Sequence, residues 1–110
     1  MIKVVVCAAR KPGLSVEEFQ RHWRERHGPL VARIPGVRRY VQSHPLPESY
    51  DGPNPPPYDG LAEIWWDDLE ARARGRQTPE YRTVAEDELR FVDHGRSVTF
   101  VTEERFIAGE

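Results

Sequence analysis

The sequence has only one cysteine, Cys7, in 110 residues. An internal disulfide and a cysteine-rich zinc site are therefore excluded. There is no run of about 20 apolar residues such as a membrane helix needs. Residues 1–9 are too short for a signal peptide and run directly into Arg10 and Lys11. These absences predict a cytoplasmic protein without a membrane partner.

An excess of positive charge is also absent. Sixteen basic side chains stand against eighteen acidic ones, and the formal net charge of −2 disfavours nucleic acid as a partner. The sequence contains no glycine-rich phosphate loop and no dinucleotide-binding pattern, so we expect no cofactor. The hydrophobic fraction of 38% fits a single domain, residues 1–110, with one modest core.

The apolar patterns and turn residues predict an α+β fold. We expect strands at 2–9, 37–44, 61–66 and 96–102, main helices at 15–34 and 78–92, and a short helix at 67–75. The order strand, helix, strand, strand, helix, strand is that of the ferredoxin-like βαββαβ arrangement. In that arrangement an antiparallel sheet carries both main helices on one face. The other face needs cover, which predicts a homodimer formed through the sheet.

Two segments should lie outside this sheet and its helices. Six of the ten prolines fall within residues 45–58, which predicts a stiff, extended loop that cannot join a sheet. Long loops of this kind serve as lids or as arms that hold a partner. Residues 103–110 should form an extended acidic tail.

The first main helix carries the most informative pattern. A capping box at Ser15–Glu18 starts it, and its apolar stripe includes Trp23 and His27. Gly28–Pro29 predicts a kink next to His27, because proline removes a helical hydrogen bond and crowds the preceding turn. His22 lies five residues before His27. In an α-helix this spacing does not place two ligands on one face, so we expect no metal site.

Several motifs resemble those of the EthD family. They are Lys11–Phe19, His22–Trp23, His27–Leu30, Pro35–Tyr40, Tyr58–Gly60, Glu63 with Trp65, and Phe91–Asp93. The resemblance implies a dimeric α/β barrel, in a superfamily that includes cofactor-independent monooxygenases, muconolactone isomerases, polyketide cyclases and haem-degrading enzymes. It implies an oxidoreductase, lyase or isomerase without selecting one, because one fold hosts many reactions.

The candidate catalytic residues are His27, Tyr40 and His44. An imidazole at position 27 titrates near neutral pH and can move a proton on a bound molecule. Alternatively, His27 is a core residue bonded to a carbonyl that Pro29 leaves free. Tyr40 and His44 share one strand face, where they line either a pocket or a dimer contact.

Four further residues are candidates for a ligand pocket: Trp23, Glu63, Trp65 and Tyr81. Aromatic side chains at these positions stack on an aromatic ligand or simply fill the core. Glu63 shares a strand face with Trp65, where burial would raise the pKa of its carboxyl group. Pairing of Glu63 with a nearby arginine is the structural alternative.

Two functions remain open. The first is a cofactor-independent enzyme that oxidises, isomerises, dehydrates or decarboxylates a small hydrophobic, oxygen-bearing molecule, with His27 as general acid or base. The second is a non-catalytic ligand-binding or accessory protein of a degradation pathway. It would need the same pocket but no titrating residue.

Overall fold

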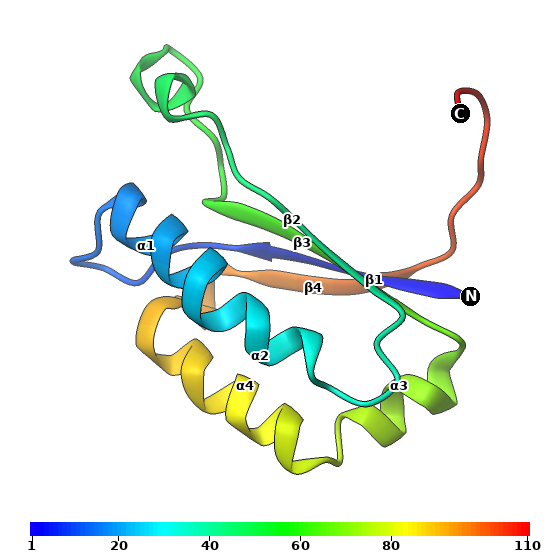
Figure 1. Cartoon of the computed structure of the whole chain (residues 1–110). Coiled ribbons are helices and arrows are strands. Elements are labelled where there is room, and N and C mark those ends of the chain that lie inside the picture. Colours follow the sequence, from blue (N-terminus) through cyan, green and yellow to red (C-terminus); the bar gives the residue numbers. More distant parts are fainter.

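Four antiparallel strands form one sheet in the order β2-β3-β1-β4. In the computed structural model, which describes residues 1–110, the strands are β1 (Ile2–Ala8), β2 (Arg39–Ser43), β3 (Gly60–Trp66) and β4 (Val98–Thr102). The main helices are α1 (Val16–His22), η1 (Trp23–His27), α2 (Gly28–Ala32), α3 (Leu69–Gly75) and α4 (Pro79–Phe91). Figure 1 shows the helices on one face of the sheet. The predicted ferredoxin-like fold is confirmed.

The core lies between this helical layer and the inner face of the sheet. Alternate residues of β1 point toward the helices, and Val4 and Ala8 among them are buried. Phe19 of α1 and Phe91 of α4 are fully enclosed, at 0% and 2% exposure, and their rings lie 5.4 Å apart. These side chains hold the first and last helices together above the sheet.

The start of the first helix is as predicted. The Glu18 amide donates to the Ser15 hydroxyl oxygen at 3.0 Å, and the Ser15 amide donates to the Glu18 carboxylate at 2.9 Å. This reciprocal capping box satisfies two amides of the first turn that have no helical partner.

The expected break near His27 takes the form of a π-helical turn, η1, between α1 and α2. The Gly28 amide donates to the carbonyl of Trp23, five residues back. The extra residue shifts the hydrogen-bond pattern immediately before Pro29, whose nitrogen has no proton to donate. The helix therefore continues past proline instead of ending there.

Helical spacing in residues 78–92 predicts an inner face of Tyr81, Val84, Ala85, Leu89 and Val92, and this prediction was partly wrong. Thr78 caps the helix as expected, and its side chain accepts from the Tyr81 amide. Leu89, expected inward, is 62% exposed, whereas Asp87 is buried at 4% exposure. The inner stripe follows Val84, Asp87 and Phe91 because hydrogen bonds compensate the buried carboxylate.

Two arms project from the sheet side of the molecule, away from the helices (Figure 1). The first is the proline-rich loop 45–58, which contains a short 3-10 helix, η2 (Pro47–Asp51), and is therefore less extended than predicted. Tyr50 anchors it by donating to the buried Asp59 at 2.7 Å. The second is the tail 103–110, whose Phe106 and Ile107 are strongly exposed. None of the helices is long and apolar enough to cross a membrane.

Candidate active site

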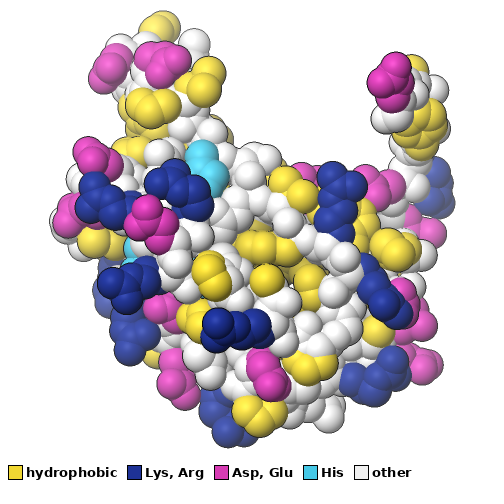
Figure 2. Space-filling view, viewed as in Figure 1, with side chains coloured by type: hydrophobic (Ala, Val, Ile, Leu, Met, Phe, Trp, Pro, Cys, Tyr) yellow, Lys and Arg dark blue, Asp and Glu magenta, His cyan; other side chains and the backbone are white.

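A mostly apolar cavity of about 450 Å³ lies between the sheet and the helices. Its hydrophobic walls come mainly from β1, β3, the first helical segment and α4: Val4, Val6, Ala8, Trp23, Val31, Ile34, Ala62, Ile64, Trp66, Val84, Phe91 and Val92. The polar lining residues are His27, Tyr40, Arg72, Arg76, Tyr81, Glu88, His94, Ser97 and Thr99. Figure 2, viewed as in Figure 1, shows hydrophobic side chains near the centre of the molecule, with charged side chains around them. Such a cavity suits a small organic molecule.

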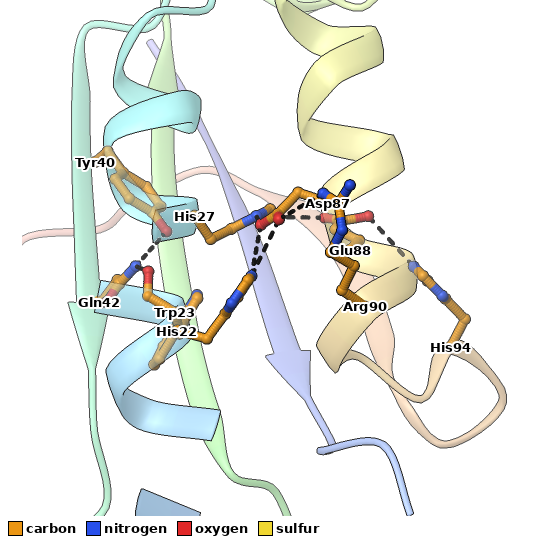
Figure 3. Close-up of polar contacts among 9 residues, drawn as sticks. All are labelled: His22, Trp23, His27, Tyr40, Gln42, Asp87, Glu88, Arg90 and His94. Carbon is orange, nitrogen blue, oxygen red and sulfur yellow. Dashed lines mark hydrogen bonds and ion pairs between the residues drawn. The ribbon is translucent and has the colours of Figure 1, made fainter. Parts of the chain in front are cut away.

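His27 enters this cavity as half of a buried pair. Its Nδ1 lies 2.8 Å from Asp87 Oδ2 (Figure 3). A carboxylate oxygen can only accept, so Nδ1 carries the proton and Nε2 keeps its lone pair. Burial lowers the pKa of His27 and outweighs the opposing hydrogen bond with Asp87. The ring is therefore neutral near pH 7, with Nε2 as a proton acceptor.

Asp87 is held by three cationic or hydrogen-bonding partners. His22 Nε2 lies 3.0 Å from both carboxylate oxygens, and Arg90 Nη1 donates to Oδ1 at 3.2 Å. Burial by itself would raise the pKa of Asp87, but the hydrogen bonds from His27 and His22 together lower it. The carboxylate thus stays ionised and fixes the His27 ring in one tautomer.

The π turn explains how both histidines reach one carboxylate. We expected His22 to lie away from His27, since residues five apart diverge on an α-helix. In η1 the hydrogen bonds run from residue i to i+5, which brings such residues to the same side. That expectation was therefore wrong: both rings contact Asp87 and pack within 5 Å of the Phe91 ring centroid.

Tyr40 supplies the second polar group on the cavity wall. Its hydroxyl oxygen accepts from Gln42 Nε2 at 2.8 Å, which leaves its own proton free to donate (Figure 3). Burial raises the pKa of Tyr40 to about 12, so the phenol stays protonated. Gly28 permits this arrangement, because an added Cβ there would approach Gln42 Nε2 to 3.2 Å.

His44 does not line the cavity and is linked to it only through Gln42. Its Nε2 is 2.8 Å from Gln42 Oε1, and its ring lies 4.5 Å from that of Trp23. Gln42 in turn donates to the Trp23 carbonyl at 2.9 Å. Through this chain His44 orients the amide that contacts Tyr40. We therefore treat His44 as a positioning residue.

Glu63 and Trp65 lie on the opposite face of the sheet, away from the cavity. Glu63 forms an ion pair with Lys3 at 2.7 Å. The expected cationic partner is therefore present, but it is a lysine instead of an arginine. Trp65 Nε1 donates to Glu104 of the tail at 2.6 Å. Strand alternation explains the placement, because odd and even positions of β3 face opposite ways. Trp66 is the tryptophan of β3 that lines the cavity.

Of the expected site residues, the structure brings His27, Tyr40, Trp23 and Tyr81 to the cavity wall. Asp87 was missed because an acidic residue in a helix is usually exposed. A signal for it was present in the sequence. Asp87 lies three residues after Val84 and four before Phe91, so it falls on the apolar stripe of α4.

The buried neutral state of His27 should make the protein less stable in mild acid. Its pKa is below the ordinary value of 6.5 in the folded chain, so the unfolded chain binds the proton first. The free energy of unfolding should therefore fall as the pH drops from about 7 to about 5. Asp87 does not contribute in this interval, because its pKa is below the ordinary value of 3.8. Urea unfolding at several pH values measures this slope.

A His27→Gln variant provides the control for this slope. His44 also has a pKa lowered by burial and adds an effect of the same sign. The slope should therefore decrease in His27→Gln without vanishing. An identical slope in the variant and the wild type would show that His27 is not the group that titrates.

Solved structures share this fold. An EthD family protein from Bacillus halodurans matches with a TM-score of 0.74 and 24% identity, over 96% of this chain and 99% of that chain. SnoaB, a cofactor-independent oxygenase from Streptomyces nogalater, matches with a TM-score of 0.68 and 16% identity, over 99% and 97%. A dimeric ferredoxin-like protein of unknown function from Bacteroides fragilis gives 0.68 and 15%, over 94% and 95%.

Sequence relatives identify the family. An uncharacterized 11.0 kDa protein in the thcB-thcC intergenic region of Rhodococcus erythropolis is 31% identical over 86 residues, or 78% of this chain and 81% of that protein. The dehydratase aurZ of Gibberella zeae is 27% identical, over 92% of this chain and 75% of its own length. The family model of the EthD domain matches residues 11–95. The chain therefore belongs to the EthD domain family.

Proposed function

We propose that this protein is a cofactor-independent enzyme that removes a proton from a small hydrophobic, oxygen-bearing molecule. The buried His27–Asp87 pair at the wall of an apolar cavity carries this proposal. His27 Nε2 accepts the proton, and the Asp87 carboxylate stabilises the imidazolium that forms. Glu88 Oε2, 3.9 Å from Nε2, is too distant for a direct hydrogen bond, so the lone pair of Nε2 stays free to accept the proton.

Tyr40 stabilises the charge that this step creates. When a proton leaves the carbon next to a carbonyl, the electron pair of the C–H bond moves onto the oxygen. The free phenolic proton of Tyr40 can donate to that oxygen, in surroundings where burial strengthens the hydrogen bond. The resulting enolate is a shared starting point for isomerisation, for dehydration and for reaction with oxygen. The dehydratase and the oxygenase among the similar proteins support a first step of this kind.

Deuterium exchange tests the proposal without knowledge of the natural reaction. The protein would be incubated in D₂O with bicyclic and tricyclic aromatic ketones, and proton NMR would follow loss of the signal next to the carbonyl. We expect exchange with the wild-type protein for ketones that fit the cavity. Tight binding without any exchange across the panel would instead favour the non-catalytic binding protein.

We further propose a homodimer formed through the outer face of the sheet. On this face Phe100 of β4 is 52% exposed beside its partner Val5 of β1, and Val98 is 44% exposed. Both arms extend on this side and carry hydrophobic side chains (Figures 1 and 2). The dimeric relative from Bacteroides fragilis supports this assembly. A second subunit would cover apolar surface that water otherwise contacts.

A charge on this face should separate the subunits. Phe100→Glu would place an unpaired carboxylate in the interface, so we expect a monomer by light scattering on a size-exclusion column. Leu89→Glu is the matched control, because Leu89 is 62% exposed on the helical side and its replacement should leave the dimer intact. A monomeric wild-type protein at micromolar concentration would contradict the proposed assembly.

A further inference from the structure

The end of the cavity near α3 has a different chemistry from the end near His27. Arg72 and Arg76 lie one helical turn apart and both line the cavity. Neither guanidinium forms an ion pair with an acidic side chain. Arg72 is half-buried, whereas Arg76 is exposed and its guanidinium lies over the Tyr81 ring, 5.6 Å from the ring centroid. Two adjacent cations repel each other, and burial together with Arg76 lowers the pKa of Arg72. An anion placed between them would relieve this repulsion.

Trp66 forms the apolar wall at this end. It lines the cavity and is 3% exposed. The six-membered part of its ring packs under Gly75, where an added Cβ would approach to 2.5 Å. Gly75 lies between the two arginines in α3, so the Trp66 ring lies against the helical segment that carries them.

Helix α4 relates this end to the His27 end. Tyr81 contacts Arg76, and Glu88 lies beside His27 Nε2. Both residues line the same cavity. Seven residues at 1.5 Å per residue separate them by about 10 Å along the helix. This length corresponds to two or three fused aromatic rings.

We propose that Arg72 and Arg76 bind a carboxylate of the substrate, and that the substrate is a bicyclic or tricyclic aromatic acid. The acid group would lie about 10 Å from the carbon next to His27. Guanidinium groups favour this ligand because their parallel N–H donors match a planar carboxylate. The substrate role rests on the proposed function, whereas binding of the acid does not require His27.

A pair of isosteric probes tests this inference. Anthracene-2-carboxylate and the neutral anthracene-2-carboxamide have nearly the same shape, and their fluorescence reports binding to the wild-type protein. We expect the carboxylate to bind at least about tenfold more tightly near pH 7. Arg72→Met and Arg76→Met should each reduce this preference. Arg74→Met, which changes an exposed arginine of the same helix, should retain the preference.

The outcomes separate this inference from the proposed function. Equal binding of the two probes, no binding of either, or a preference that survives the Arg72→Met/Arg76→Met double replacement would overturn the carboxylate site. His27→Gln should keep the preference for the acid. Arginine-dependent binding together with no deuterium exchange in the wild type would reject the proposed enzyme but support the acid-binding end.

Discussion

Replacing His27 by glutamine should lower kcat/KM for deuterium exchange by about 10²- to 10⁴-fold, the usual contribution of a positioned general base. Glutamine is similar in size and keeps a hydrogen-bonding group near Asp87, but its amide does not accept a proton near neutral pH. The exchange assay on the best ketone of the panel measures the effect. Circular dichroism would verify that the variant is folded. Turnover equal to wild type would remove His27 from the mechanism.

Asp87→Asn separates orientation from proton transfer. The Asp87 hydrogen bond opposes the effect of burial on His27, so removal of the negative charge should lower the pKa of His27 further. The acid limb of the pH profile should then move to lower pH, because His27 would stay neutral in more acidic solution. A role in folding alone would reduce stability without moving this limb. His22→Gln should move the acid limb less, since His22 contacts Asp87 but does not line the cavity.

Phe19→Ala should destabilise the fold by about 3–5 kcal/mol, the typical loss when a buried phenylalanine is truncated. Phe19 is completely buried, and its ring lies 5.4 Å from Phe91 and 5.8 Å from Trp23. The resulting void would lie next to Trp23, the first residue of the π turn. A loss of this size is a large part of the stability of a small domain. Chemical denaturation monitored by tryptophan fluorescence gives the value.

Leu89→Ala is the control for Phe19→Ala. Leu89 is 62% exposed, so its truncation should change the free energy of unfolding by less than about 0.5 kcal/mol. If both variants lost the same small amount, the phenylalanine cluster would not be the centre of the core. Phe91→Ala is less suitable as a first test, because the Phe91 ring also contacts the rings of His22 and His27.

Local sequence signals determined most of the secondary structure. Ser15 and Glu18 mark the start of α1, and Thr78 marks the start of α4, because their side chains accept from amides that have no helical partner. Gly28–Pro29 marks an interruption next to His27, because the proline nitrogen has no proton to donate within the helix. These effects act within one or two turns of the chain and do not depend on the remaining structure.

The sequence by itself determined the order of the elements, their caps and the presence of an imidazole on the apolar stripe of the first helix. Only the tertiary structure decided which residues complete the site. Asp87 is 60 residues from His27, and Trp66 rather than Trp65 faces the cavity. The physical reason is that hydrogen bonds and burial join side chains across the fold. A hydrophobic periodicity of 3.6 or 2 residues indicates which face of a helix or strand is buried, but not which residues that face contacts.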